Sequence, residues 1–441
     1  MKTAKKVLLF IMGLMIVSMI ILLSCKNRYT GPGDKGIFEE GSSGETGENG
    51  GGGDSGPIPL VGSGGGLIIN GYTLPINSLS QEEQEQDYDP EFNSVVLFNE
   101  GIPALTVTAK GVILAASGTS ESANYIVVKR SSDMGKTWTE VQANTSDSDL
   151  DNMQTHPFFI NGYDGSVLMG VATTNATKNK TTIYKSQDDG MNWSKLTQID
   201  TNIVNKGNMK VHNGYVTYGQ GITLRHQSDN SQKLLFPYFY GTNSPVTKNG
   251  YTATMCSTDG GNSFTQLGNP YGKFSSYETK FIELSDGKIL LNMRADNNQS
   301  FWMISSDCGA NWTVTTKNTD NENDYGNHAD LIRYEFDGKD IRDVKDALMI
   351  HSTVGGNAYT VRLTENDFND GKAGNKYQHM REDLAEGKAK DDGYPAITVL
   401  PDGTIATLTE ENSGVVFRRF NLHWLTYGVD VIDYNQHLKF K

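Results

Sequence analysis

Four copies of one eight-residue pattern decide the fold of this chain. Each copy follows an apolar or β-branched run, so each predicts a strand, a tight turn and a second strand that begins at an aromatic residue. Ser and Asp side chains hydrogen-bond the backbone of turns, and Gly adopts a positive φ without steric cost. The copies share the frame S-x-D-x-G-x-x-aromatic and read S-S-D-M-G-K-T-W from Ser131 to Trp138, S-Q-D-D-G-M-N-W from Ser186 to Trp193, S-T-D-G-G-N-S-F from Ser257 to Phe264, and S-S-D-C-G-A-N-W from Ser305 to Trp312.

The spacing of the copies predicts the architecture. Their Asp residues stand at positions 133, 188, 259 and 307, which gives intervals of 55, 71 and 48 residues. A repeat of about 50 residues with this content is typical of a β-propeller with one blade per repeat. Apolar runs alternate with Gly, Asn and Asp turns from about Glu91 to Lys441, a length that predicts an all-β domain of six four-stranded blades. The polar stretch Asn366–Ala389 is expected to be an insertion with a helical turn near Met380–Ala385.

Composition limits the partners of the chain. The net charge of −14 over 441 residues argues against nucleic acid and anionic membrane surfaces as electrostatic partners. The Asp-rich run Asp147–Asp151 is interpreted as a solvated loop, with a Ca²⁺ site as the weaker alternative. We expect a monomer that needs no cofactor and no metal.

The N-terminus predicts export. Lys2, Lys5 and Lys6 precede an apolar run, Val7–Leu23, as in a secretory signal peptide. The segment Leu22-Leu23-Ser24-Cys25 resembles the lipobox of bacterial lipoproteins. This resemblance implies that residues 1–24 are removed and that Cys25 carries a lipid that anchors the exported protein to the bacterial membrane, facing the surface or the periplasm. A transmembrane anchor is the alternative.

Residues 25–90 are expected to tether the folded domain, residues 91–441. The segment is dominated by Gly, Ser and acidic residues and cannot bury enough apolar surface to fold. Of the two other cysteines, Cys256 precedes one copy of the pattern and Cys308 lies inside the next. They are therefore predicted to be buried thiols in different blades, with a disulfide between them as the alternative.

The repeated pattern resembles the Asp box of sialidases and related propellers, where it is a structural staple at the blade rim, away from the catalytic face. Two further stretches carry the resemblance, which covers about Asn93 to Thr426. Tyr277–Arg294 resembles the family pattern E-x-x-x-x-E-L-x-D-G-x-L-x-x-x-x-R, which implies that Glu278 assists the nucleophile and that Arg294 binds the substrate carboxylate. Tyr394–Glu410 resembles the nucleophile strand, which implies that Tyr394 is the nucleophile and that Glu410 orients an arginine.

The chemistry of sialic acid explains this residue choice. Its anomeric carbon carries a carboxylate, which would repel a carboxylate nucleophile but not a neutral phenol. Sialidases with a Tyr nucleophile are accordingly an exception to the two-carboxylate scheme of glycoside hydrolysis. The planar fork of Arg matches a carboxylate bidentately.

The chain departs from the family pattern at several positions. Gly101 stands where the family has the first of three clamp arginines, Ser117-Gly118-Thr119 where it has the second, and Asn357 where it has the third. Arg362 follows on the opposite face of the predicted strand. Glu121 is the only carboxylate in the interval expected to supply the acid.

The sequence thus predicts a retaining exo-α-sialidase-like hydrolase that acts on sialylated glycans or glycoproteins. The alternative is a catalytically inactive propeller lipoprotein that binds glycans or a surface partner. An enzyme would need replacement arginines, for which Arg225 and Arg333 are the candidates, whereas a binding protein would not.

Overall fold

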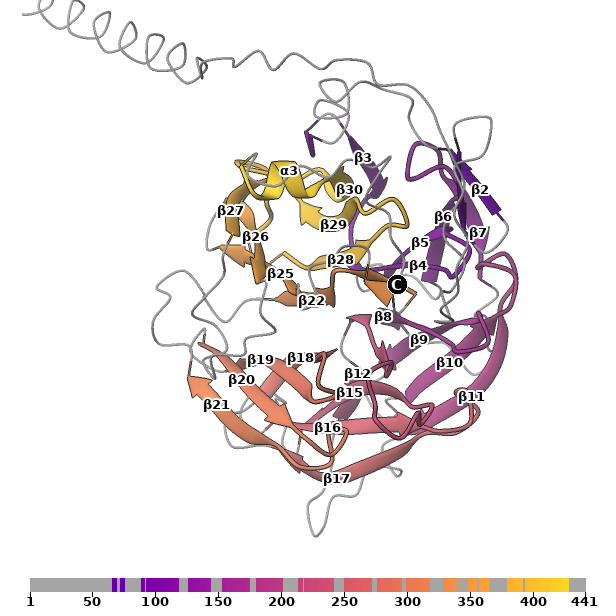
Figure 1. Ribbon diagram of the computed structural model, residues 1–441, viewed down its shortest axis with the longest axis vertical. Coiled ribbons are helices and arrows are strands. Elements are labelled where there is room, and N and C mark those ends of the chain that lie inside the picture. Colours follow the sequence, from indigo (N-terminus) through magenta and orange to yellow (C-terminus); the bar gives the residue numbers. More distant parts are fainter. Residues whose placement is uncertain are drawn as a thin grey trace, which may run out of the picture. The chain divides into compact units, whose positions relative to one another are not determined.

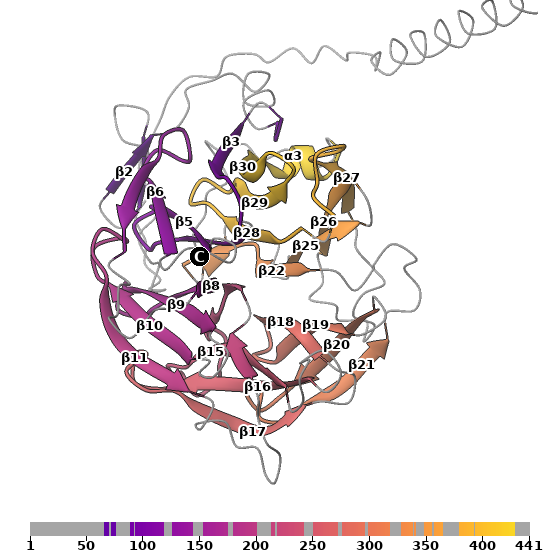
Figure 2. The ribbon, with the colours of Figure 1, turned by 180° about the vertical axis from the view of Figure 1, so that it is seen from behind.

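Six antiparallel sheets of four or five strands form most of the described chain in a computed structural model (Figures 1 and 2). All described residues lie in one compact unit, Ser55–Lys441. The structure describes residues 66–69, 72–75, 89–91, 93–118, 126–143, 153–174, 180–200, 213–216, 218–241, 250–271, 276–295, 299–317, 328–337, 339–340, 348–354, 357–364, 379–391 and 393–427.

The sheets follow one another along the chain, with one exception at the ring closure. Sheet 1 contains β4 (Ile102–Val107), β5 (Ile113–Gly118), β6 (Ile126–Ser131) and β7 (Thr139–Gln142). Sheet 2 contains β8 (Met153–Asn161), β9 (Val167–Thr174), β10 (Lys180–Ser186) and β11 (Ser194–Asp200), with β13 (Gly219–Gln220) parallel to β8. Sheet 3 contains β12 (Asn213–Val216), β15 (Leu234–Gly241), β16 (Gly250–Ser257) and β17 (Thr265–Tyr271), with β14 (Ile222–Thr223) beside β15.

The second half of the ring repeats this arrangement. Sheet 4 contains β18 (Ser276–Glu283), β19 (Ile289–Ala295), β20 (Gln299–Ser305) and β21 (Thr313–Lys317). Sheet 5 contains β22 (Ala329–Arg333), β25 (Leu348–Val354), β26 (Ala358–Thr364) and β27 (His379–Leu384). Sheet 6 contains β28 (Pro395–Val399), β29 (Ile405–Glu411), β30 (Gly414–Phe420) and β3 (Ser94–Phe98). The remaining elements are the pairs β1 (Gly66–Ile69) with β2 (Tyr72–Pro75) and β23 (Glu335–Phe336) with β24 (Lys339–Asp340), and the short helix α3 (Leu422–Leu425).

The predicted six-bladed propeller is confirmed. In Figure 1 strands β4, β8, β18, β22 and β28 lie nearest the centre, whereas β7, β11, β17, β21 and β27 lie at the periphery. Each sheet is therefore a blade that runs from the axis outward, and in sheet 6 the outer strand is β3 from the start of the domain. Among the described residues, no helix is both long enough and apolar enough to span a membrane.

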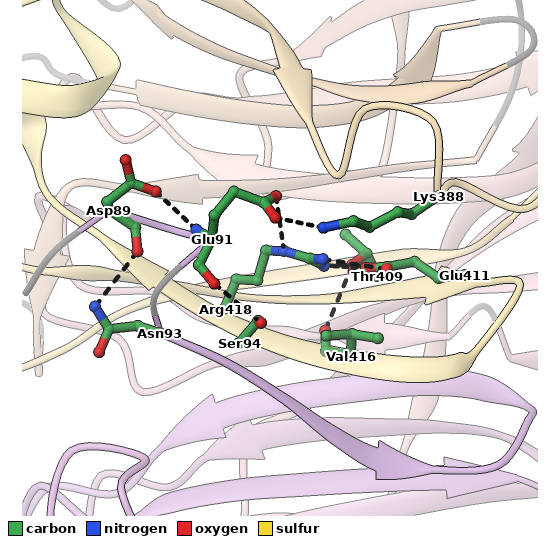
Figure 3. Close-up of polar contacts among 9 residues, drawn as sticks. All are labelled: Asp89, Glu91, Asn93, Ser94, Lys388, Thr409, Glu411, Val416 and Arg418. Atoms are coloured by element: carbon green, nitrogen blue, oxygen red, sulfur yellow. Dashed lines mark hydrogen bonds and ion pairs between the residues drawn. The ribbon is translucent and has the colours of Figure 1, made fainter.

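The ring is closed by pairing the first strand of the domain with the last, β3 with β30. Figure 3 shows the polar contacts that accompany this pairing. The Arg418 guanidinium and the Glu411 carboxylate form a fully buried ion pair, and Arg418 also donates to the Thr409 hydroxyl at 3.1 Å. Glu91, just before β3, pairs with Lys388 and lies 3.8 Å from Arg418. Arg418 and Glu411 lie on β30 and β29, so removing one partner of this buried pair should destabilise sheet 6 by about 3–5 kcal/mol, whereas the contacts of Glu91 are the ones that reach the segment before β3.

The four predicted boxes are strand–turn–strand units between the two outer strands of sheets 1 to 4, and we call them the box turns. In the turn 186–193 the Ser186 hydroxyl donates to Asp188 at 2.8 Å, and it accepts from the Gly190 N–H at 2.9 Å. The Asn192 N–H donates to the same Asp at 2.9 Å. The other three turns repeat these three bonds within 0.1 Å.

The box turns also join neighbouring blades. The conserved frame places two successive residues at positive φ, for example Gly260 at 71° and Gly261 at 94°. A Cβ at Gly261 would lie 2.5 Å from the Leu168 side chain of the preceding blade, so any larger residue there would have to displace Leu168 as well as adopt a positive φ. Equivalent glycines, Gly135 and Gly190, face Phe417 and Leu114 of their preceding blades.

Two sequence expectations need correction. The predicted helical turn at Met380–Ala385 is wrong, because residues 379–384 form β27, which pairs with β26 at the edge of sheet 5. Ladder bonds from the neighbouring strand here override a weak local helical preference. The predicted tether, residues 25–90, contains the two-stranded β1–β2 pair. Cys256 and Cys308 are free thiols in sheets 3 and 4, as predicted. Cys256 is buried, as expected, whereas Cys308 is only half-buried.

Candidate active site

The ends of three inner strands bring the predicted catalytic residues together. Glu278 is the third residue of β18, His328 directly precedes β22, and Tyr394 directly precedes β28. Arg294 lies near the end of β19, which runs antiparallel to β18 and so returns to the same level. We call the cluster of Glu278, Arg294, His328 and Tyr394 the first mouth of the propeller axis.

Tyr394 and Glu278 meet across 116 residues of sequence. The Tyr394 hydroxyl donates to the Glu278 Oε1 atom at 3.2 Å. Arg294 Nη1 lies 3.4 Å from the other carboxylate oxygen of Glu278. The predicted proximity of these three residues is confirmed.

His328 is a member of this cluster that sequence reasoning missed. Its ring stacks on the Tyr394 ring, with centroids 3.5 Å apart, and Arg294 Nη1 lies 2.8 Å from its Nε2. Its Nδ1 atom lies 3.3 Å from the same Nη1 and 3.7 Å from Glu278 Oε1. A guanidinium only donates, so the ring nitrogen that it contacts accepts and the imidazole is neutral. No motif marks His328; only its place before an inner strand could have indicated it.

Burial and charge set the protonation states at the first mouth. Burial lowers the pKa of His328 to about 3 and that of nearby His156 to about 4, so both are neutral at neutral pH. Burial by itself disfavours the Glu278 charge, but positive charge at His328, when it is protonated, and at Arg294 outweighs it and lowers the pKa of Glu278. Glu278 is therefore ionised and can accept the phenol proton of Tyr394.

A buried ion pair lies beneath the first mouth. Lys280 Nζ lies 3.4 Å from Asp330 Oδ1, and both side chains are almost fully buried. The same ammonium lies 3.7 Å from the centre of the Tyr218 ring and donates to the Tyr218 carbonyl. The Asp330 carboxylate accepts from the Ile397 N–H at 3.0 Å, which links sheets 5 and 6. We call Tyr218, Lys280 and Asp330 the floor of the first mouth.

The floor supports the nucleophile directly. The Tyr218 ring meets the Tyr394 ring edge-on, with centroids 4.8 Å apart and planes at 88°. Lys280 is two residues from Glu278 on β18, and Ile397 is three residues from Tyr394 on the chain that enters β28. The pair thus fixes the two strands that carry the Tyr394 hydroxyl and the Glu278 carboxylate.

Glu410 has a different role from the one expected. Its carboxylate contacts Lys390 Nζ at 2.5 Å and accepts from the Tyr394 N–H at 3.3 Å. The Glu410 N–H in turn donates to the Tyr394 carbonyl at 3.1 Å. Within the described chain, Glu410 therefore fixes the backbone of Tyr394 and does not contact Arg294.

The structure shows what stands at two of the family's clamp positions and where the two candidate replacement arginines lie. A Cβ at Gly101, where φ is 117°, would lie 2.1 Å from the Gly118 carbonyl oxygen, so no side chain fits there. Ser117 is buried and donates to the Glu100 carbonyl at 3.1 Å. The expected replacements are wrong, because Arg225 and Arg333 line a pocket at the other end of the inner strands.

The other positions singled out in the sequence are either placed by the structure or lie outside the described residues. Asn357 is exposed at the start of β26, and Arg362 is fully buried within that strand. Glu121, the predicted acid, lies outside the described residues, as do Cys25 and the run Asp147–Asp151. Within the described ranges, no three His, Cys, Asp or Glu residues are placed to hold a metal ion.

Comparisons with known proteins show the family and agree with the fold. Residues 102–373, more than half of the chain, match the family model of the BNR repeat-like domain. A curated sialidase from Micromonospora viridifaciens is 26% identical over 357 residues, which cover 74% of this chain and 52% of the relative. The chain thus spans about half the length of this relative.

Solved structures with the same fold include two bacterial proteins. The intramolecular trans-sialidase of Ruminococcus gnavus superposes with a TM-score of 0.58 at 15% identity, covering 76% of this chain and 98% of that one. The NanB sialidase of Streptococcus pneumoniae superposes with a TM-score of 0.59 at 16% identity, covering 77% of this chain and 71% of that one. At these identities the likeness concerns the fold alone.

Proposed function

Because the chain belongs to the BNR repeat-like family and has the propeller fold of bacterial sialidases, we propose that it is a retaining exo-α-sialidase that removes terminal sialic acid from glycoconjugates. The observation that carries this proposal is the 3.2 Å contact between the Tyr394 hydroxyl and an ionised Glu278. A nucleophile held by a base within hydrogen-bond reach is the signature of covalent catalysis.

The proposed reaction uses these groups in two steps. Glu278 takes the phenol proton while Tyr394 Oη bonds to the anomeric carbon and the glycosidic C–O bond breaks. The leaving oxygen receives a proton from an acid, for which Glu121 is the candidate. Water then hydrolyses the tyrosyl–sugar bond, so two inversions give net retention. Arg294 would bind the substrate carboxylate by exchanging its contacts with Glu278 and His328 for the stronger charge-assisted pair.

The second candidate function is glycan binding without turnover. It is favoured by Gly101, where the backbone leaves no room for a clamp arginine, and by the placement of Arg225 and Arg333 away from the first mouth. Each charge-assisted hydrogen bond that the substrate carboxylate loses costs about 1.5–3 kcal/mol. A site with one guanidinium would then bind sialic acid weakly and position it poorly.

Covalent trapping separates these two functions. A 2,3-difluorinated sialic acid should leave a sugar adduct on the tryptic peptide that contains Tyr394, detected by mass spectrometry, and the same label should fail on Tyr394→Phe. The wild type should also release the fluorophore from a fluorogenic sialoside. Saturable binding of sialyllactose with neither adduct nor turnover would support the binding protein instead.

We also propose that the protein is exported and held at the membrane by a lipid on Cys25. The lipobox-like Leu22–Cys25 segment supports this proposal. Metabolic labelling with a fatty acid should mark the wild type and not Cys25→Ser. Equal labelling of the two proteins would rule the anchor out.

A further inference from the structure

His328 contacts two of the groups on which the proposed reaction depends. Its ring stacks on the Tyr394 ring, with centroids 3.5 Å apart and planes at 28°. Its Nε2 atom lies 2.8 Å from Arg294 Nη1. Tyr394 leads into sheet 6, Arg294 lies on sheet 4 and His328 leads into sheet 5, so the imidazole joins three blades. Because His328 is only 2% exposed, it can act on a substrate through these neighbours and not by direct contact.

The Tyr394 ring needs support that the reaction does not disturb. Tyr394 is half-buried and directly precedes β28, so its side chain lies beyond the packed part of the strand. Its hydrogen bond to Glu278 changes as the phenol proton is transferred. The stacked His328 ring and the perpendicular Tyr218 ring exchange no proton and stay in place. They fix the plane of the phenol, and a misplacement of about 1 Å at a reacting group can cost 10²-fold in rate.

Arg294 needs a partner that orients it without occupying its charge. Its side chain is 23% exposed, so a substrate carboxylate can reach the guanidinium. Its contact with His328, at 2.8 Å, is shorter than its contact with Glu278, at 3.4 Å. A carboxylate in place of the imidazole would compete with the substrate, and a cation would repel Arg294. A neutral ring nitrogen accepts an ordinary hydrogen bond, which is weaker and is readily exchanged for the substrate carboxylate.

Glu410 does not orient Arg294. The family resemblance implies that Glu410 orients an arginine, but its carboxylate contacts Lys390 and the Tyr394 N–H. We propose that His328 is a positioning residue with two functions: its ring aligns the Tyr394 phenol for attack, and its neutral nitrogen holds Arg294 ready for the substrate carboxylate. This inference rests on the proposed function, because both partners act in the same reaction.

Two variants separate these functions in steady-state kinetics on a fluorogenic sialoside. His328→Phe keeps a flat ring beside Tyr394 but removes the acceptor, so KM should rise about tenfold, the effect of one lost hydrogen bond, with kcat near that of the wild type. His328→Gln keeps a neutral acceptor but removes the ring, so kcat should fall on the order of 10²-fold with KM near that of the wild type. His379→Phe, on the outer strand of the same sheet, is the matched control and should change neither constant.

A purely structural role of His328 predicts a different pattern. Loss of folded protein would lower the apparent kcat of both variants and leave KM unchanged, and this result would overturn the inference. Unchanged kinetics in both variants would overturn it as well.

Binding distinguishes a failure of this inference from a failure of the proposed function. A wild type without turnover contradicts the function, and calorimetry with 2,3-didehydro-2-deoxy-N-acetylneuraminic acid then tests His328. Affinity that falls about tenfold in His328→Phe but not in His328→Gln supports its role at Arg294, whereas equal affinities contradict that role. A wild type that neither binds this acid nor turns over a sialoside overturns the function and the inference together.

NMR of the ligand-free, full-length protein keeps the test valid if a His328 variant does not fold. With ¹⁵N-labelled histidine, the His328 ring should show one nitrogen with the shift of a hydrogen-bonded acceptor. Arg294→Met removes the donor and should move this signal. A signal that is the same in the two proteins would show that the imidazole does not hold Arg294.

Discussion

The box turns and the first mouth both depend on carboxylates, but the residues that bind these carboxylates lie at very different distances along the sequence. Asp188 accepts from Ser186 and Asn192, two and four residues away. Glu278 contacts Arg294 and Tyr394, which are 16 and 116 residues away and belong to two different sheets. The turn is complete as soon as one short segment folds, whereas the site exists only when several blades are in place.

The electrostatics of the two regions differ for the same reason. In the box turns, bonds from turn N–H groups and hydroxyls outweigh a limited burial and lower the pKa of Asp133, Asp188, Asp259 and Asp307. At the first mouth, Glu278 keeps its charge beside Arg294 although its surroundings are buried. Changes at the rim should therefore alter stability without altering chemistry, whereas changes at the axis should alter chemistry most.

The largest effect is expected for Tyr394→Phe, which removes one oxygen atom. If Tyr394 is the nucleophile, kcat should fall on the order of 10⁶-fold, as in enzymes that lose a covalent nucleophile. The melting temperature should stay close to that of the wild type, because stacking on His328 is retained. Steady-state kinetics on a fluorogenic sialoside, with a thermal melt of the same sample, measure both. Unchanged turnover would remove Tyr394 from the mechanism.

Replacing one carboxylate at the axis and one at the rim sharpens the contrast. Glu278→Gln should lower kcat roughly 10²–10⁴-fold, the range for a lost general base, and should flatten the acid limb of the pH–rate profile. Asp188→Asn should leave kcat unchanged and lower the melting temperature. Equal loss of activity in the two variants would show that the rim turn acts on the site.

Two adjacent glycines test the blade-joining role of the box turns. Gly260 and Gly261 both have positive φ, but only a Cβ at Gly261 would overlap another blade, at Leu168. Gly261→Ala should therefore be about 1–3 kcal/mol less stable than Gly260→Ala, the cost of overpacking. Chemical denaturation of the two variants measures the difference. Equal stabilities would mean that only backbone strain matters at the turn.

A smaller contrast is expected in the pH dependence of stability. The folded pKa of His328 is about 3, below its ordinary value of 6.5, so its stabilising contribution is full above pH 6.5 and is lost as the pH falls toward 3. The Glu278 carboxylate raises the pKa of this imidazole and so reduces the loss, whereas positive charge at Arg294, at Lys280 and, when protonated, at His156 lowers the pKa and increases the loss. The aspartates of the box turns lose their stabilising contribution only below about pH 4.

Variants separate the pH range in which His328 affects stability from the lower range in which the box aspartates do. His328→Gln should flatten the loss of stability between pH 6.5 and 4 relative to wild type, whereas Asp188→Asn should leave that interval unchanged and flatten the curve only at lower pH. Melting temperatures across this range provide the measurement. A wild-type curve that is flat from pH 7 to pH 4 would contradict a neutral, buried His328.

Resemblance to a family located Tyr394, Glu278 and Arg294, because spacing along two strands is a property of the sequence. It could not locate His328 or correct the role of Glu410. His328 carries no motif, and Glu410 contacts Lys390 and the Tyr394 backbone although its position matches the family acid. Contacts of this kind depend on which side chains neighbouring blades present to one another.

By itself the sequence determined the box turns and the six-bladed ring, and it left a disulfide between Cys256 and Cys308 open until the structure showed two free thiols. The turns and the ring depend on bonds within a few residues or on a repeat length, which are both readable along the chain. Only the tertiary structure decided that Gly101 has no room for an arginine. It also placed Arg225 and Arg333 in a pocket at the other end of the inner strands, and it buried Lys280 and Asp330 beneath the first mouth. Those outcomes depend on contacts between segments of different blades, and a shift of one strand would change all the side chains that it contacts.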